Sequence, residues 1–288
     1  MSDLNYNNSG NENNSFMEKI KAYWNSIPLV VKIITTITII FYLMSWISLL
    51  ARLVVLFANV PLYTLYKFHI WRVVTSLLVT PSILNILFAF MSWLPKALMM
   101  EREVGSTRYF LNTFTRSTLI QIMFTFIIFF FSLLFESSLL KQPSMGLWPL
   151  ILADITISCI AEPEREVMFF FIPYPIKSKY YPWVLIGFFT LLNFSIQIDI
   201  LCGVLFGYIY HWKLKEYLEY SMQFVQKVEN SFVCSCFKTN PSFIATSASE
   251  LGRGIGFSSG GNIGGGNTNA AAVNTSTDNY EVSNLFLI

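Results

Sequence analysis

The chain has 288 residues, of which 54% are hydrophobic and only 12% are charged, and its net charge is +2. Soluble domains carry about 25% charged residues, so this composition excludes an ordinary water-soluble fold and indicates a membrane protein. The small net charge and the lack of a strongly basic block give no electrostatic reason to expect a nucleic acid partner.

Residues 1–28 open the chain with a polar, Asn-rich segment. This segment lacks the basic region and the short apolar core of a cleavable signal peptide, so the first apolar run must itself direct the chain to the membrane. We expect residues 1–28 to form a polar N-terminus in the cytosol.

Charged residues bracket the apolar runs that follow, and crossing about 30 Å of hydrocarbon takes about 20 apolar residues. Residues 180–212 are too long for one crossing, because a single helix of that length measures about 50 Å. They are expected to form two short spans that turn at the polar residues 193–199. The sequence therefore predicts an all-α polytopic membrane domain of six spans over residues 29–215, with spans at 33–51, 83–98, 117–135, 146–161 and in the two parts of 180–212.

Residues 53–72, between the first two spans, are apolar but interrupted by proline and by basic residues. We expect a large interfacial loop whose short helices lie in the membrane surface. Fifteen of the 19 Lys and Arg residues fall on the side of the membrane that holds the N-terminus. By the positive-inside rule, both termini are predicted to lie in the cytosol.

Two segments follow the last span. Residues 216–237 carry charges at helical spacing and are expected to continue the last span as a cytosolic helix. Residues 238–288 are rich in Gly, Ser and Asn and cannot bury enough apolar surface to offset chain entropy. We expect this tail to be disordered.

Three short motifs occur in the order in which rhomboid proteins carry them. Trp71-Arg72 precedes Thr75-Ser76 at the entry to the second span, Glu101 is followed by Gly105-Ser106 at its exit, and Gly203 and Gly207 form a GxxxG pair in the last span. Together with six spans and a large first loop, this conjunction resembles the rhomboid superfamily and implies a rhomboid-like helical bundle. In such a bundle, small residues spaced by four let two helices approach closely.

The resemblance also shows which catalytic groups are missing. Trp148 occupies the position of the nucleophilic serine of active rhomboids, and Ile200 occupies that of the histidine base. The two residues that assist the oxyanion from the second span match Asn85 and Ala89, so only Asn85 keeps a side chain able to form hydrogen bonds. A serine is a weak nucleophile without a nearby base, so we predict that the chain is not an enzyme and needs no cofactor or metal.

An unconventional intramembrane serine protease is the alternative. The chain has only two histidines, and His211 falls near the opposite end of the last span from Ser144. A protease of this kind could still use a catalytic dyad of Ser144 and Lys141. Alternatively, Lys141 is a loop residue at the membrane interface.

Among rhomboid-like pseudoproteases, Gly146-Leu147-Trp148-Pro149 with Asp154, and Lys179-Tyr180-Tyr181-Pro182, resemble the ubiquitin-associated-domain-containing rhomboid-like branch first and Derlins next. This resemblance implies an adaptor of the endoplasmic reticulum membrane that binds membrane-protein clients and links them to ER-associated degradation. A ubiquitin ligase and a segregase ATPase would be its partners. The Gly-rich tail leaves no room for a ubiquitin-binding domain, and residues 251–257 are only faintly similar to the Derlin motif for the segregase.

Other residues are candidate structural or client-binding positions. Asp154 inside the fourth span is either functional or hydrogen-bonded to Thr156, Ser158 or Asn193, because an ionised acid in the bilayer is costly. A small transporter is the third interpretation of the chain. Such a protein would need an acidic residue inside the membrane, and Asp154 is the candidate. Trp71 and Arg72 either contact clients and headgroups or anchor their loop, and Glu101 is expected to pair with Arg102 or Arg108.

Overall fold

A computed structural model describes residues 17–19, 21–80, 82–169, 172–218, 220–231 and 237–246. Most of the expected N-terminal segment and of the tail, including residues 251–257, lies outside the described residues. The elements are α2 (Leu29–Trp46), α3 (Ser48–Phe57), α4 (Pro61–Tyr66), α5 (Trp71–Thr75), η1 (Ser76–Leu78), α6 (Ile83–Val104), α7 (Ser106–Leu134), η2 (Ser137–Lys141), α8 (Trp148–Ala161), β1 (Glu166–Phe169), β2 (Ile172–Lys177), η3 (Ser178–Tyr180), α9 (Tyr181–Asn193), α10 (Ile198–Ile209), a π-helical turn (Tyr210–Leu214), α11 (Lys215–Leu218) and α12 (Met222–Glu229).

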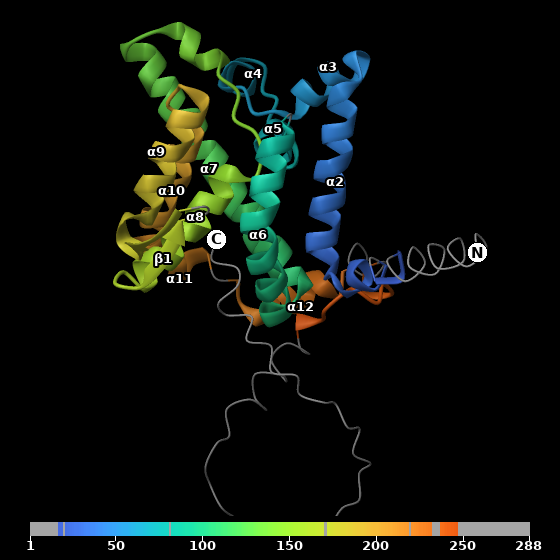
Figure 1. Cartoon of the computed structure of the whole chain (residues 1–288). Helices are drawn as coiled ribbons and strands as arrows, with labels where there is room; N and C mark the ends of the chain where they lie inside the picture. The colour runs from blue at the N-terminus through green and yellow to red at the C-terminus, as the bar shows by residue number, and fades with distance from the viewer. Residues whose placement is uncertain are drawn as a thin grey trace, which may run out of the picture.

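The helices form a bundle with two distinct ends (Figure 1). The lower end in that view holds the start of α2, the α6–α7 turn, the β1–β2 hairpin and α12, and the upper end holds α3, α4 and the chain after α7. Helix α10 packs mainly against α8, and the buried core runs between α8, α10 and the inner faces of α6, α7 and α9.

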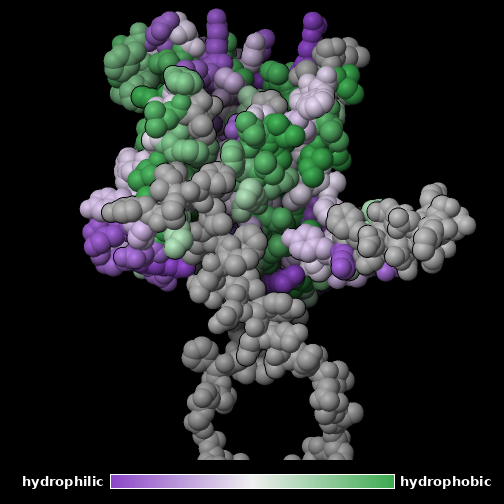
Figure 2. Space-filling view, viewed as in Figure 1, coloured by the Kyte–Doolittle hydropathy of each residue, from purple (hydrophilic) through white to green (hydrophobic). Residues whose placement is uncertain are grey.

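The surface has the apolar character of a membrane protein. Large hydrophobic side chains that soluble proteins bury are exposed on the long helices, among them Leu43, Leu87 and Phe130. Figure 2 shows hydrophobic residues gathered between two hydrophilic ends of the molecule. Because exposed apolar surface on this scale needs a nonaqueous solvent, this band is the lipid-facing surface of the bundle.

Within the residues that the structure describes, three helices are long and apolar enough to cross a bilayer: α2, α6 and α7. The helix pair expected in residues 180–212 is confirmed, because α9 and α10 meet at a turn in residues 194–197. Helices α8 and α9, with 14 and 13 residues, are shorter than the usual span of about 20, whereas α10 continues without a break through the π-helical turn into α11. The count of six spans therefore stays a prediction.

Two boundaries differ from the prediction. The first apolar run bends at Ile47, which adopts an extended conformation, so α2 ends there and α3 begins a new direction. Helix α7 begins at Ser106, eleven residues before the expected start at 117, because Arg108 and Arg116 are accommodated within the helix. The expected short helices of residues 53–72 are confirmed as the end of α3, α4 and the start of α5.

The mostly helical structure is consistent with the predicted all-α membrane protein, and the segment between α8 and α9 adds two short strands that the sequence did not predict. Strands β1 and β2 form an antiparallel hairpin in which Glu166 pairs with Lys177. Both strands are edge strands, so the prolines within β2 remove no needed hydrogen bond. At the base of the hairpin, the ammonium groups of Lys177 and Lys179 donate to Glu164 and hold the pKa of its carboxyl below the ordinary value.

The chain after α10 also differs from the prediction. A single helix over residues 216–237 is not formed, because α11 ends at Leu218 and α12 starts only after Ser221, whose hydroxyl caps it. The expected disorder from residue 238 onward is wrong for residues 238–246, which return to the lower end of the bundle and bond to its backbone.

Candidate functional site: a vacated catalytic centre and its supports

The position of the missing nucleophile is filled by an apolar contact. Trp148 is the first residue of α8 and is only 5% exposed, and its ring packs edge-on against Phe189 of α9 with centroids 4.3 Å apart. Its indole N–H has no hydrogen-bond acceptor among the described residues. An indole has no group that can act as an acyl-transfer nucleophile.

The position of the missing base is also apolar. Ile200 lies in the first turn of α10, is 2% exposed and belongs to the same buried cluster as Trp148. On α6, Ala89 is buried and Asn85 is half-buried, and the backbone N–H of Asn85 donates to the capping hydroxyl of Ser82. The four vacated positions therefore contribute packing and a helix cap.

Neither histidine is paired with a serine in the part of the chain that the structure describes. The His69 ring stacks on Trp71 with centroids 4.5 Å apart, and His211 is exposed in the π-helical turn at the lower end. Ser144, at the upper end, is fully buried and pairs its backbone with Asn59 as an isolated β-bridge. No hydrogen bond joins Ser144 to Lys141 within the described residues, so the expected alternative dyad is not formed.

Ser144 instead belongs to a buried polar network that the sequence did not reveal. Its hydroxyl accepts from Gln121 Nε2 at 2.9 Å and donates to Asp199 Oδ2 at 3.4 Å. The Asn59 amide donates to Gln121 Oε1 at 2.8 Å and to Thr125 Oγ1 at 3.1 Å. The network joins the first loop, α7, the segment before α8 and α10, and no periodic pattern in the sequence connects these distant residues.

The Trp71-Arg72 motif anchors the first loop. Arg72 is 2% exposed, and its Nη1 donates to the carbonyl of Ala58 at 3.1 Å while its guanidinium lies over the Tyr63 ring at 4.9 Å. Trp71 is half-exposed on the surface. The arginine thus holds the end of α3 and α4 against α5, and only the tryptophan remains available to an outside partner.

Glu101 has different partners from those expected. Its carboxylate is fully buried and accepts the backbone N–H groups of Val30 and Val31, each at 2.8 Å, and the hydroxyl of Ser106 at 2.6 Å. The expected ion pair with Arg102 or Arg108 is wrong, because those side chains bond to the Ser26 carbonyl and to the Met222 sulfur. Glu101 caps the N-terminus of α2 from another helix, where a negative charge is favoured.

The backbone conformation at residue 105, in the turn that follows the helix of Glu101, requires a glycine. Gly105 has a φ of +85°, which L side chains rarely adopt, and a Cβ built on it would lie 2.7 Å from the Thr246 Cα. Glu101, Gly105 and Ser106 therefore form one unit that joins the α6–α7 turn to α2 and to the chain after α12.

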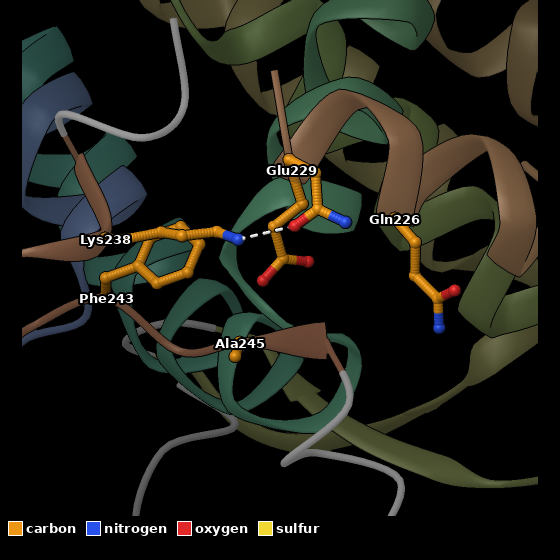
Figure 3. Close-up of a pocket in the computed structure, with 6 residues that line it drawn as sticks. Gln226, Glu229, Lys238, Phe243 and Ala245 are labelled. Atoms are coloured by element: carbon orange, nitrogen blue, oxygen red, sulfur yellow. Dashed lines mark hydrogen bonds between the residues drawn. The ribbon is translucent and has the colours of Figure 1, made fainter. Parts of the chain in front are cut away.

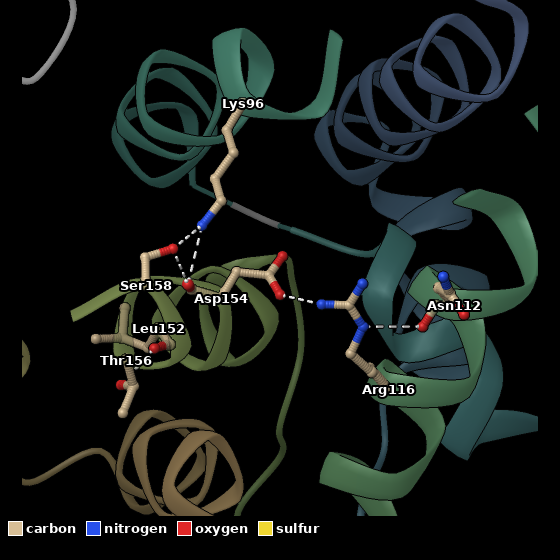
Figure 4. Close-up of polar contacts among 7 residues, drawn as sticks. All are labelled: Lys96, Asn112, Arg116, Leu152, Asp154, Thr156 and Ser158. Atoms are coloured by element: carbon tan, nitrogen blue, oxygen red, sulfur yellow. Dashed lines mark hydrogen bonds and ion pairs between the residues drawn. The ribbon is translucent and has the colours of Figure 1, made fainter. Parts of the chain in front are cut away.

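Asp154 pairs with a cation rather than with the expected Thr156, Ser158 or Asn193. Its carboxylate lies 2.5 Å from Arg116 Nη1, and the side chains of the pair are 22% and 14% exposed (Figure 4). Lys96 of α6 donates to the Asp154 carbonyl at 2.9 Å and to the Ser158 hydroxyl at 2.6 Å. The ion pair joins α7 to α8 and the lysine joins α8 to α6, so the Asp154 carboxylate is paired with a cation at the contact of these helices.

The two glycines of α10 mark its contact with α8. A Cβ on Gly203 would lie 2.2 Å from the Pro149 carbonyl oxygen, and one on Gly207 would lie 2.7 Å from the Thr156 Cβ. Each glycine therefore lets the two helices approach to a distance that any side chain would prevent.

No cluster of three or more His, Cys, Asp or Glu residues that could hold a metal ion occurs within the described ranges. The fold and this centre define the chain as a helical membrane protein of the rhomboid-like kind, with apolar side chains at the positions of the catalytic groups. A model of the Der1-like family matches residues 27–227, and the chain belongs to that family.

A known protein supports the same assignment. The chain is similar to Rhomboid-like protein 15 of Arabidopsis thaliana, with 24% identity over 236 residues that cover 78% of this chain. The match spans 57% of the length of that relative. The rhomboid-like resemblance of the sequence is confirmed.

Proposed function

We propose that this protein is a catalytically inactive rhomboid-like adaptor of the endoplasmic reticulum membrane, which binds membrane-protein clients and links them to ER-associated degradation. The observation that carries this proposal is the burial of Trp148 and Ile200 where an active rhomboid would need a serine and a histidine. Membership of the Der1-like family supports the adaptor role and the organelle.

We also propose six spans with both termini in the cytosol. Under this arrangement α8 and α9 cross the bilayer in spite of their length, and the lower end of the bundle faces the cytosol. The predominance of Lys and Arg on that side supports the orientation. A ubiquitin ligase and a segregase ATPase are the partners that this role requires.

The proposal is tested by isolating the full-length protein from its own cells in a mild detergent and identifying the bound proteins by mass spectrometry. We expect a membrane ubiquitin ligase, a segregase ATPase and ubiquitin-modified membrane proteins. Recovery of the protein without any component of the degradation machinery would contradict the adaptor role. Protease access to epitopes at the two termini in sealed microsomes tests the orientation separately.

The specific observation that favours a second function is the approach of the Ser144 hydroxyl to the Asp199 carboxylate at 3.4 Å. An acidic group beside a serine is an arrangement from which an unconventional protease could be built. The full burial of this serine and its bond from Gln121 argue for a structural role. A covalent serine-reactive probe should leave the wild-type protein unlabelled, and labelling that is lost in Ser144→Ala would establish the protease.

A further inference from the structure

Residues 240–246, here called the tail segment, bind to the lower end of the bundle through backbone hydrogen bonds. The N–H of Leu29 donates to the Ser242 carbonyl and the N–H of Ser106 donates to the Ile244 carbonyl, both at 2.9 Å. The N–H of Ile244 donates in return to Ser106 Oγ at 3.1 Å. The backbones of alternate residues are thus recognised, as in the capture of a peptide along an open edge.

Side chains complete this tail-binding site, which consists of Leu29, Lys32, Gly105 and Ser106. The Lys32 ammonium donates to the Ser242 hydroxyl at 2.8 Å, and Thr246 is 1% exposed against Gly105. Because Gly105 has no side chain, the site accepts the backbone of a small residue at this point. The site therefore suits an uncharged peptide whose backbone lies close to Gly105.

The opposite side of the tail segment borders a pocket instead of a packed core. The pocket has a volume of about 490 Å³ and is lined by Gln226, Glu229, Asn230, Lys238, Phe243 and Ala245. Among its lining residues, the side chain of Lys238 donates to Asn230 Oδ1 at 2.8 Å across it (Figure 3). On this side the segment is therefore not enclosed by a packed core, and its polar neighbours, Gln226, Glu229 and Asn230, can bond to water when the segment leaves.

The tail-binding site is directly connected to the cap of α2. Ser106 Oγ, which accepts the Ile244 N–H, donates its own proton to Glu101, and Glu101 accepts the N–H groups of Val30 and Val31. Leu29, which bonds to the segment, is the first residue of the same helix. Through these hydrogen bonds, occupancy of the site affects the stability of the first turn of α2.

We propose that this is a peptide-binding site whose resident ligand is the chain's own residues 240–246, and that this ligand can leave and rebind. When a partner binds the chain near the segment and withdraws it, the amides of Leu29 and Ser106 lose their acceptors and the first turn of α2 is loosened. The segment thus couples events on the tail to the first helix of the membrane domain. This inference does not depend on the identity of the clients or of the degradation machinery.

The test uses the full-length protein in nanodiscs and measures amide hydrogen exchange by mass spectrometry in peptides that contain Leu29 and Ser106. Ile244→Pro removes the donated N–H from the segment without altering the binding site. We expect exchange in both peptides to rise about tenfold, because local opening sets the exchange rate. An excess of a synthetic peptide with the sequence of residues 240–247 should restore slow exchange saturably, and a scrambled peptide should not.

Asn230→Ala is the matched control, since it removes the bond across the pocket and leaves the tail-binding site intact. Exchange that is unchanged in Ile244→Pro, or that rises equally in Asn230→Ala, would overturn the proposal. A rise that the peptide does not reverse would show a fixed fold contact rather than an exchangeable ligand, which also overturns it. If Ile244→Pro aggregates, Ser242→Ala removes only the acceptor of Lys32 and should raise exchange at Leu29 about threefold, with the same rescue by peptide.

Discussion

Glu101 holds the start of one helix from the end of another. Its two carboxylate oxygens accept two backbone N–H groups and one hydroxyl in a fully buried place, so each oxygen has a partner. In Glu101→Gln, one accepting oxygen becomes an NH₂ group that cannot accept the N–H facing it. We expect the free energy of unfolding to fall by about 2 kcal/mol, the usual cost of a buried donor left without a partner.

This expectation is checked by equilibrium unfolding in mixed micelles, followed by tryptophan fluorescence. Glu103→Gln is the matched control, because Glu103 lies in the same turn of α6 but is exposed. If the two variants lose the same stability, the cap on α2 contributes nothing measurable.

The pair of Asp154 and Arg116 is the second contribution at the scale of single residues. Its side chains are largely buried, so the attraction between them is screened less than that of a surface pair. A double-mutant cycle with Asp154→Ala and Arg116→Ala should give a coupling free energy of about 1 to 2 kcal/mol. The exposed pair of Glu162 and Arg165 should give about 0.5 kcal/mol or less in the same assay, and equal couplings would contradict the structural role of Asp154.

The sequence could identify these residues but not their partners. Glu101 was matched to neighbouring arginines, whereas its donors are backbone groups about 70 positions earlier, which carry no compositional signal. The sequence alone places Arg116 just outside the span predicted at 117–135, since charges usually end apolar runs. The helix includes it because Asp154 of α8 and the Tyr210 ring, 5.7 Å from its guanidinium, surround the charge.

At the scale of elements, the contact of α10 with α8 depends directly on the glycines of α10. A methyl group on Gly203 would lie 2.2 Å from the Pro149 carbonyl oxygen, so Gly203→Ala has to push the two helices apart. We expect this substitution to lower the free energy of unfolding by about 2 kcal/mol. Loss of stability should appear in the same micelle assay.

Gly187 of α9 provides the control for this helix contact. A Cβ built on Gly187 meets nothing within 4 Å, so Gly187→Ala should be neutral or should stabilise the helix by about 0.5 kcal/mol. Equal effects at the two glycines would mean that helix propensity, and not close approach, determines the result.

Element prediction succeeded where apolar runs are long or end in clear turn residues. The separation of α9 from α10 followed from length alone, and the GxxxG pair pointed to a close helix contact. The sequence did not predict the hairpin, because β2 contains two prolines, a composition that fits an apolar loop as well as a strand. It did not predict the packing of residues 238–246, because their partners are distant in the sequence and several of the hydrogen bonds join backbone groups, which leave no signal in the composition.

At the scale of the whole molecule, the bundle has helices of two lengths. Helices α8 and α9 contain 14 and 13 residues, whereas α6 and α7 contain 22 and 29. At 1.5 Å per residue the two short helices measure about 20 to 21 Å, well below the 30 Å or so of an ordinary hydrocarbon core. If both of them cross the bilayer, the lipid around this half of the bundle must be thin.

This mismatch predicts a dependence of stability on lipid length. In bilayers of 14-carbon monounsaturated lipids the midpoint of thermal unfolding should exceed that in 22-carbon lipids by about 5 °C or more, because each ångström of mismatch costs a fraction of a kcal/mol. Inserting four leucines after Leu191, at the exposed upper end of α9, lengthens the short side without disturbing its packed face and should reduce the difference. The same unfolding midpoint in both lipids would show that the short helices do not span the membrane together, and the proposed six-span arrangement would then fail.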